Sequence, residues 1–290
     1  MIIVITGPTG VGKTKMSVEL AKRVDAEIIN ADSMQVYKNL DIATAKIKEE
    51  EKDNVPHHLF DIVEKEENYT VYDYQKDCRK TINEIASRNK NIIIVGGTGL
   101  YIKAALYNYN FNEESNTYDF SNMTNEELYN KIKETNPNIN VHINNRKRLE
   151  RDLTKINNNT ISDGKGNEII YPFNIIGLTT NRDELYNRIN KRVELMVEEG
   201  LIEEARDLYN KNINSKAIMT GIGYKELYKY FDGDITLEEA LELIKRNSRR
   251  YAKRQYTFFN NQFNMNWFEV NYDNFNETID EVYKFITKED

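Results

Sequence analysis

The segment Gly7-Pro8-Thr9-Gly10-Val11-Gly12-Lys13-Thr14 fits the P-loop pattern, in which four residues separate a glycine from Gly-Lys-Ser/Thr. The apolar, β-branched run 1–6 predicts a buried strand before it, and apolar residues recurring every fourth position after Lys13 predict an amphipathic helix. This order predicts a phosphate site built from backbone N–H groups and a helix N-terminus. Lys13 is expected to reach the phosphates and the Thr14 hydroxyl to ligate Mg²⁺. A glycine-rich turn without a ligand is the alternative.

Three further short runs predict strands of the same sheet. Residues 27–30, 91–95 and 173–178 are mostly apolar, and helical periodicities lie between them. The run 91–95 is continuous, as in strands buried on both faces of a parallel sheet. A length of 290 residues suits one large α/β domain or a domain that carries an insertion. We therefore predict an α/β fold, a P-loop NTPase or kinase-like parallel sheet flanked by helices.

The composition changes from about residue 112, where Asn, Glu and Lys become frequent and apolar residues sparse. A capping box at 124–127 begins one predicted helix, which ends before Pro137, and a second helix carries a basic cluster at 146–151. Residues 157–167 are predicted to form a polar loop. The sequence thus predicts a P-loop catalytic core at 1–111 and 173–290, and a mainly helical insertion at 112–172.

The net charge of −7 argues mildly against nucleic acid as a partner, yet the charge is unevenly spread. Six cations fall within residues 245–254 with no acid among them, and the cluster at 146–151 is the second basic patch. Cations of the patch at 245–254 share a helix face and are candidates for contacts with the phosphate backbone of a nucleic acid. A solvated basic face is the alternative. The candidates are Arg246, Arg250, Lys253 and Arg254.

The single cysteine, Cys78, excludes an internal disulfide, and its helical spacing predicts a core position. No apolar run approaches the ~20 residues of a membrane span, and no leader pattern is present. We therefore expect a cytoplasmic protein without a membrane partner. The adjacent His57 and His58 have no second ligand pair at a fitting spacing, so they are a weak metal motif.

Four polar residues outside the P-loop are candidates for the site. Asp32 follows the predicted strand 27–30, at the end where parallel sheets place ligands, although a turn-capping role is equally compatible. Thr98 follows two glycines that could let a ligand approach the backbone closely. Arg188 and Arg192 share one helix face, where they could bind a diphosphate or be solvated.

Besides the P-loop, six segments match a known family in the same order along essentially the whole chain: 32–37, 41–46, 55–59, 95–101, 222–226 and 251–255. By these motifs the chain resembles the bacterial tRNA dimethylallyltransferases, the tRNA isopentenyltransferase family. The resemblance implies transfer of a dimethylallyl group from dimethylallyl diphosphate to N6 of adenosine 37, in tRNAs that read codons starting with U. It also implies that the P-loop and Mg²⁺ hold this diphosphate rather than ATP.

The resemblance assigns roles to individual residues. Asp32 matches the general base, Thr98 a residue that lines the reaction channel and touches tRNA, and Arg188 and Arg192 diphosphate ligands. Two segments match tRNA contacts: Ser33, Met34 and Gln35 at the target nucleotide, and Lys147, Arg148, Leu149, Glu150 and Arg151 in the insertion. We expect a monomer with no obligate protein partner.

Three rival functions stay open at this point. A small-molecule kinase would place ATP on the same P-loop, since a fold does not fix a function. An isopentenyltransferase acting on free AMP or ADP would not need the basic patches. A non-catalytic P-loop RNA-binding protein would not need Asp32.

Overall fold

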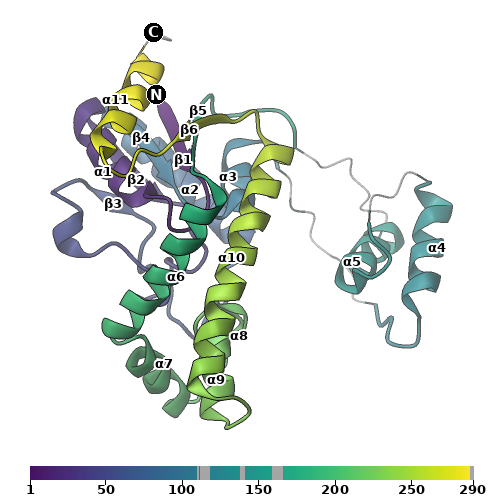
Figure 1. Cartoon of the computed structure of the whole chain (residues 1–290). Helices are drawn as coiled ribbons and strands as arrows, with labels where there is room; N and C mark the ends of the chain where they lie inside the picture. Colours follow the sequence, from purple (N-terminus) through teal and green to yellow (C-terminus); the bar gives the residue numbers. More distant parts are fainter. Residues whose placement is uncertain (110, 112–117, 138–140, 159–165, 288–290) are drawn as a thin grey trace. The chain divides into compact units, whose positions relative to one another are not determined.

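The computed structural model describes residues 1–109, 111, 118–137, 141–158 and 166–287 (Figure 1). The chain divides into two compact units, one formed by Met1–Leu106 with Ile170–Asp290 and the other by Tyr107–Ile169. The polar loop predicted at 157–167 lies largely outside the described residues. The two units are described separately.

The larger unit is built on one parallel sheet of six strands in the order β3-β2-β4-β1-β5-β6. The strands are β1 (Ile2–Thr6), β2 (Ala26–Asn30), β3 (His57–His58), β4 (Asn91–Val95), β5 (Asn174–Thr179) and β6 (Asn266–Glu269). Their central members are almost wholly buried, as parallel strands covered on both faces must be. The predicted parallel α/β fold is confirmed.

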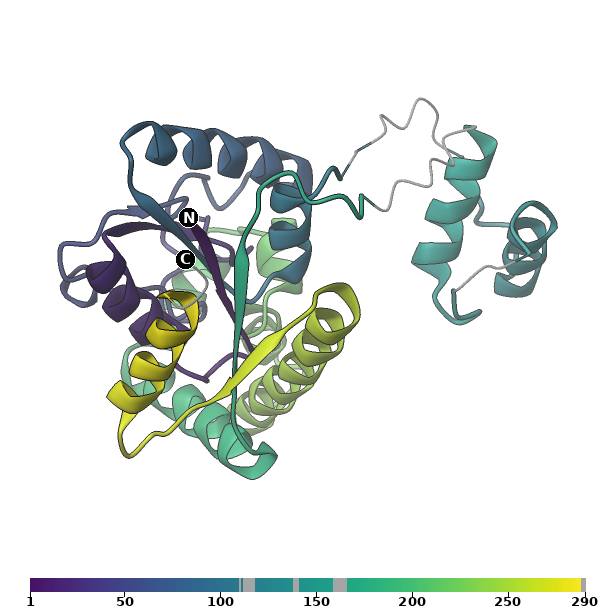
Figure 2. The same ribbon diagram turned by 90° about the horizontal axis from the view of Figure 1, so that it is seen from above.

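Helices cover this sheet, and they include α1 (Lys13–Val24) and α11 (Phe275–Thr287), which share an apolar core with the central strands. Figure 2 shows α2 (Val71–Ser87) and α3 (Gly99–Leu106) against the opposite side of the sheet. A second core joins five further helices of this unit: α6 (Arg182–Glu198), α7 (Leu201–Asn210), α8 (Lys216–Thr220), α9 (Tyr224–Phe231) and α10 (Leu237–Gln262). The single turn η1 (Glu49–Glu51) lies outside that core.

Local sequence signals account for where several helices begin. The Thr70 hydroxyl accepts a hydrogen bond from the backbone N–H of Asp73 at the start of α2, and Thr236 does the same for Glu239 at the start of α10. Cys78 is fully buried on α2, which confirms its predicted core position. No helix in the described part of the chain has the length and apolar character needed to cross a bilayer.

The register of the sheet brings three loops together at one edge. Val95 is paired with Asn30 on one side and with Ile5 on the other, so β2, β4 and β1 end at the same level. The chain after these strands forms the P-loop, the Asp32 segment and the Thr98 segment. Ligand sites of open parallel sheets lie at this carboxyl edge.

The smaller unit contains α4 (Asn125–Thr135) and α5 (Arg146–Asn157). The Thr124 hydroxyl accepts from the backbone N–H of Glu127, as its capping box predicts. The two helices pack through a small apolar core formed by Phe120, Leu128, Ile132, Val141, Leu149 and Leu153.

Candidate functional site

The P-loop has the backbone geometry that its glycines allow. Gly7 has a φ of +138°, and a side chain there would place its Cβ 2.4 Å from the carbonyl oxygen of Leu178. Gly12 has a φ of 101° and precedes α1 without any side-chain capping bond. The first turn of α1 therefore keeps its N–H donors for an anion.

Lys13 lies folded over the loop it is expected to serve. Its Nζ donates to the carbonyl oxygens of Gly7 at 3.1 Å and Pro8 at 2.8 Å. Burial and the nearby Arg192 lower the pKa of Lys13 to about 7, against a smaller opposing effect of Asp32. A lysine with a strongly lowered pKa at the base of a cavity is a candidate site residue, and a bound anion would favour its charged form.

Both predicted arginines reach the P-loop from α6. Arg192 donates from Nη1 to the Thr9 hydroxyl at 2.8 Å, and Arg188 donates from Nε to the carbonyl oxygen of Gly10 at 3.3 Å. The Arg188 guanidinium also lies 3.7 Å from the ring centroid of Tyr272. Of the two readings left open by the sequence, this arrangement favours a phosphate-facing role over a solvated face.

Two adjoining cavities open at this edge. One, of about 440 Å³, is lined by P-loop residues that include Lys13 and Thr14, together with both arginines. The other, of about 270 Å³, is here called the apolar cavity after the Ile, Val and Met side chains that α6 contributes, although polar side chains such as Arg254 of α10 and Lys225 also line it. The 220–223 segment completes its wall. Six residues line both cavities: Thr9, Asp32, Thr44, Arg192, Met196 and Tyr251.

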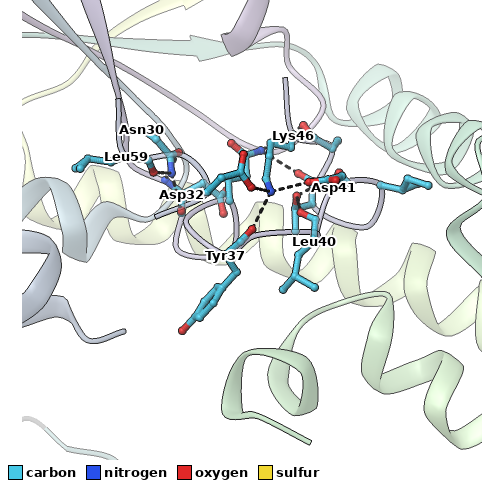
Figure 3. A network of polar contacts seen from close by, with 12 residues as sticks. Asn30, Asp32, Tyr37, Leu40, Asp41, Lys46 and Leu59 are labelled. Atoms are coloured by element: carbon cyan, nitrogen blue, oxygen red, sulfur yellow. Dashed lines mark hydrogen bonds and ion pairs between the residues drawn. The ribbon is translucent and has the colours of Figure 1, made fainter. Parts of the chain in front are cut away.

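Asp32 therefore stands where the cationic cavity meets the apolar one. One carboxylate oxygen, Oδ1, accepts from the backbone N–H of Met34 at 2.9 Å, while Asn30 holds the Asp32 backbone through both amide atoms (Figure 3). The turn-capping role and the site role thus coexist. The bond to Oδ1 orients the carboxylate, and Asp32 still lines both cavities.

Thr98 is joined directly to the Asp32 segment. Its hydroxyl oxygen accepts from the backbone N–H of Ser33 at 3.0 Å, and its own backbone N–H donates to Ala31 at 3.1 Å. Ser33 and Met34 line the apolar cavity, and Gln35 lines the cationic one. The structure thus brings the predicted residues Asp32, Thr98 and 33–35 into one cluster.

The 40–46 segment forms a wall of both cavities, and its supports were not predicted. Lys46 donates to the backbone oxygen of Tyr37 at 2.8 Å and pairs with Asp41 at 2.6 Å (Figure 3). From α7, the Glu204 carboxylate accepts from the consecutive backbone N–H groups of residues 41–43 at 2.8–3.1 Å. The sequence offers no signal for Glu204, which looks like any other surface acid of an amphipathic helix.

Two residues of α10, Tyr251 and Gln255, also belong to the site although only their motif was noticed in the sequence. Tyr251 lines both cavities, and burial together with Asp32 raises its pKa to about 12. Gln255 reaches Gly97, where an added Cβ would lie 2.1 Å from its Nε2. At Gly96 an added Cβ would lie 2.2 Å from the Ala31 backbone. These glycines therefore admit the protein's own groups, and Gly96 also lines the cationic cavity. That a ligand approaches them closely stays a prediction.

The basic patch on α10 is partly neutralised. Lys245 pairs with Glu194 at 3.0 Å and Glu242 at 3.2 Å, and Arg249 donates to Asn190. This corrects the sequence-based view of six cations without compensating acids. The four predicted contacts Arg246, Arg250, Lys253 and Arg254 are exposed, and within the described ranges none lies within ion-pair distance of a carboxylate.

The basic cluster of the smaller unit is also divided between packing and surface. Leu149 is fully buried in the small core, so its inclusion among the predicted RNA contacts is corrected. Glu150 pairs with Arg146 at 2.7 Å. Lys147, Arg148 and Arg151 are exposed.

The described residues contain no group of three His, Cys, Asp or Glu side chains that could hold a metal ion by themselves. His57 instead contacts the backbone oxygen of Val55, and His58 contacts Glu27. Mg²⁺ in phosphate sites commonly has one or two protein ligands and takes the rest from phosphate and water. The exposed Thr14 hydroxyl, which lines the cationic cavity, suits that role.

Comparison with known proteins places this geometry in a family. A model of the family described as IPP transferase matches residues 35–262. The tRNA dimethylallyltransferase of Anoxybacillus flavithermus is 45% identical over 98% of this chain and 96% of that protein, and that of Bacillus subtilis is 46% identical over 93% and 90%.

Solved structures agree with these relatives. The tRNA isopentenylpyrophosphate transferase from Bacillus halodurans superimposes with a TM-score of 0.77 at 43% identity, covering 99% of this chain and 95% of that one. A eukaryotic dimethylallyltransferase acting on tRNA has a TM-score of 0.79 at 27% identity, covering 99% of this chain and 79% of its own.

Proposed function

The chain belongs to the IPP transferase family, and we propose that it transfers a dimethylallyl group from dimethylallyl diphosphate to N6 of adenosine 37 of a tRNA. The proposed acceptors are tRNAs that read codons starting with U. The products are N6-(dimethylallyl)adenosine and diphosphate. The relatives' names support the activity and its substrates.

The observation that carries this proposal is the position of Asp32 between two unlike cavities. The cationic cavity, with Lys13, Arg188 and Arg192, suits a diphosphate. The apolar cavity beside it suits a flat, uncharged base. A carboxylate at their junction is placed to act where the allylic carbon of one substrate would meet the amine of the other.

The reaction then needs little covalent help from the protein. The bond between the allylic carbon and the diphosphate oxygen breaks, and the N6 nitrogen of adenine forms the new bond to that carbon. The diphosphate leaves with the electron pair, so P-loop N–H groups and the arginines stabilise the charge that develops there. Asp32 accepts the proton that N6 loses, acting as general base.

Lys13 changes partners in this scheme. It donates to the Gly7 and Pro8 carbonyls in the structure and turns to the diphosphate when that anion binds. When bound through the Thr14 hydroxyl, Mg²⁺ would supply further stabilisation of the leaving group.

The exposed cations fit the RNA. Arg246, Arg250, Lys253 and Arg254 on α10 are proposed to contact the phosphate backbone, as are Lys147, Arg148 and Arg151 on α5. Adenosine must leave its stack to reach the half-buried carboxylate of Asp32 between the cavities, so the reaction requires a flipped base. Shape and backbone contacts, rather than base pairs, would position the anticodon stem-loop.

The choice of acceptor and donor tests the proposal. Purified protein is incubated with Mg²⁺ and either dimethylallyl diphosphate or ATP, each with unmodified tRNA transcript or AMP. Digestion of the RNA and mass spectrometry are expected to reveal dimethylallyl-adenosine only with dimethylallyl diphosphate and tRNA. Phosphoryl transfer from ATP would establish a kinase, and dimethylallylated AMP would establish a transferase that acts on free nucleotides.

A further inference from the structure

Gln255 on α10 bridges two loops that are far apart in the chain. Its side-chain oxygen, Oε1, accepts from the backbone N–H of Thr9 in the P-loop at 3.0 Å. Its amide nitrogen, Nε2, donates to the backbone oxygen of Gly97 at 3.1 Å. The side chain is 4% exposed, so both bonds are shielded from water.

Each of these loops is also hydrogen-bonded to a segment that carries a residue of the proposed reaction. Thr9 accepts from Arg192 through its hydroxyl, so Gln255 and Arg192 hold the same P-loop residue from two sides. Gly97 precedes Thr98, whose hydroxyl accepts from the backbone N–H of Ser33 next to Asp32. The amide of Gln255 thus closes a path of hydrogen bonds between the diphosphate cavity and the carboxylate.

We propose that Gln255 is a positioning residue that holds the P-loop and the Thr98 segment at a fixed separation, so that donor and acceptor meet at Asp32. This inference rests on the proposed transfer reaction. Both hydrogen bonds of Gln255 go to protein atoms, so we expect its loss to change the rate of transfer in the ternary complex more than the binding of either substrate. Displacing reactants by about 1 Å commonly costs about 100-fold in rate.

The bridge requires a side chain that carries both a donor and an acceptor, as an amide does. One end must accept from an N–H and the other must donate to a carbonyl, and only a side chain with both groups satisfies the pair. Gly97 leaves room for the Gln255 amide, since the Cβ of any larger residue would lie 2.1 Å from Nε2. A glutamate can replace the bridge only when protonated, because its O–H then donates to Gly97 while its carbonyl oxygen accepts from Thr9.

Two variants of the full chain test the proposal. Gln255→Met keeps the volume and removes both bonds, and we expect kcat to fall by about 100-fold with KM for tRNA changed less than about twofold. Gln255→Glu is expected to lose activity at pH 8 and to recover part of it, relative to wild type, as the pH falls towards 6. Charged residues that line the same cavity include Lys13, Asp32 and Arg192, and the lowered pKa of Lys13, about 7, falls in this pH range, so wild type is measured at each pH.

Gln75→Glu is the matched control. Gln75 is also a buried glutamine on a helix, 7% exposed, and donates from Nε2 to the backbone oxygen of Ala104 at 2.8 Å, away from both cavities. We expect this variant to show the general effect of a buried glutamate on thermal stability. Its activity, relative to wild type, should not recover as the pH falls.

The outcomes separate this inference from the proposed function. If wild type transfers no dimethylallyl group, the proposed function fails. If wild type is active and Gln255→Met retains kcat within about twofold, or if the two glutamate variants have the same pH profile, Gln255 has no positioning role and the inference is overturned.

Discussion

Arg192 on α6 and Thr9 in the P-loop are joined by a hydrogen bond of 2.8 Å from Nη1 to the hydroxyl oxygen. The pair brings a guanidinium to a loop whose N–H groups already suit an anion, and both residues line the two cavities of the site. A helix from the second half of the chain therefore completes the proposed phosphate site, which begins at residue 7.

Replacing Arg192 by Lys is expected to raise the KM for dimethylallyl diphosphate by about 10- to 100-fold. The physical reason is the loss of a forked, charge-assisted contact worth about 1.5–3 kcal/mol, which a single ammonium cannot reproduce. Steady-state kinetics at saturating tRNA measures the effect. Arg182→Lys, at an exposed position on the same helix, is the control and should leave KM unchanged. Equal KM values for both variants would remove Arg192 from the diphosphate site.

Lys13 is expected to make the proposed diphosphate binding dependent on pH. Burial and Arg192 lower its pKa to about 7, and a bound diphosphate would raise it by adding negative charge. Binding therefore takes up a proton between about pH 7 and the raised value, and the affinity that Lys13 contributes falls as pH rises through this window. Calorimetry with inorganic diphosphate, in buffers of different ionisation enthalpy, measures the uptake. Lys13→Met should lose it, and an unchanged uptake would show that another group titrates.

Glu204 is expected to hold the wall formed by residues 40–46. Glu204→Gln loses the charge that three backbone N–H groups and the Tyr224 hydroxyl share, and should destabilise the folded protein by about 1–3 kcal/mol. Urea unfolding of both proteins gives this difference. Glu203→Gln changes an exposed neighbour on the same helix and should cost less than about 0.5 kcal/mol. Similar costs for the two variants would contradict a specific support.

The cations of α10 differ in how they are paired, and this predicts different effects on RNA binding. Arg250→Gln and Lys253→Gln each remove an exposed charge and should weaken tRNA binding while reducing the salt slope by about 0.7–0.9. Lys245→Gln removes a charge already paired with Glu194 and Glu242, so its slope should change less. Filter binding at several salt concentrations provides the comparison. A common slope for all three variants would rule out this surface.

Local patterns in the sequence predicted the central elements of the fold. The P-loop, the strand before it and the helix after it are set by neighbouring residues, as are the capping boxes at Thr70, Thr124 and Thr236. The short α8 and α9, of five and eight residues, were not predicted, because so few turns display little periodicity. Strand β3 was not predicted either, because its two residues are too few to display a pattern.

The supports of the site could not be predicted because they depend on long-range contacts. Gln255 and Thr9 are 246 positions apart, and Glu204 and Ile42 are 162 positions apart. Nothing in the local pattern around either residue indicates its partner. Asp32 and Thr98, in contrast, were identified as candidates because each lies within three residues of the end of a predicted strand, and strand ends converge in a parallel sheet.

The most direct test of the account is transfer of radiolabelled dimethylallyl diphosphate, with Mg²⁺, to unmodified tRNA carrying A37, beside a tRNA with G37, by wild type and Asp32→Ala. We predict label on the A37 tRNA alone and a loss of about 100-fold or more in the variant, since general bases typically contribute about 100- to 10,000-fold. The variant should still bind inorganic diphosphate as wild type does. Undiminished transfer by Asp32→Ala, or label on the G37 tRNA, would contradict a carboxylate acting at the junction of the two cavities.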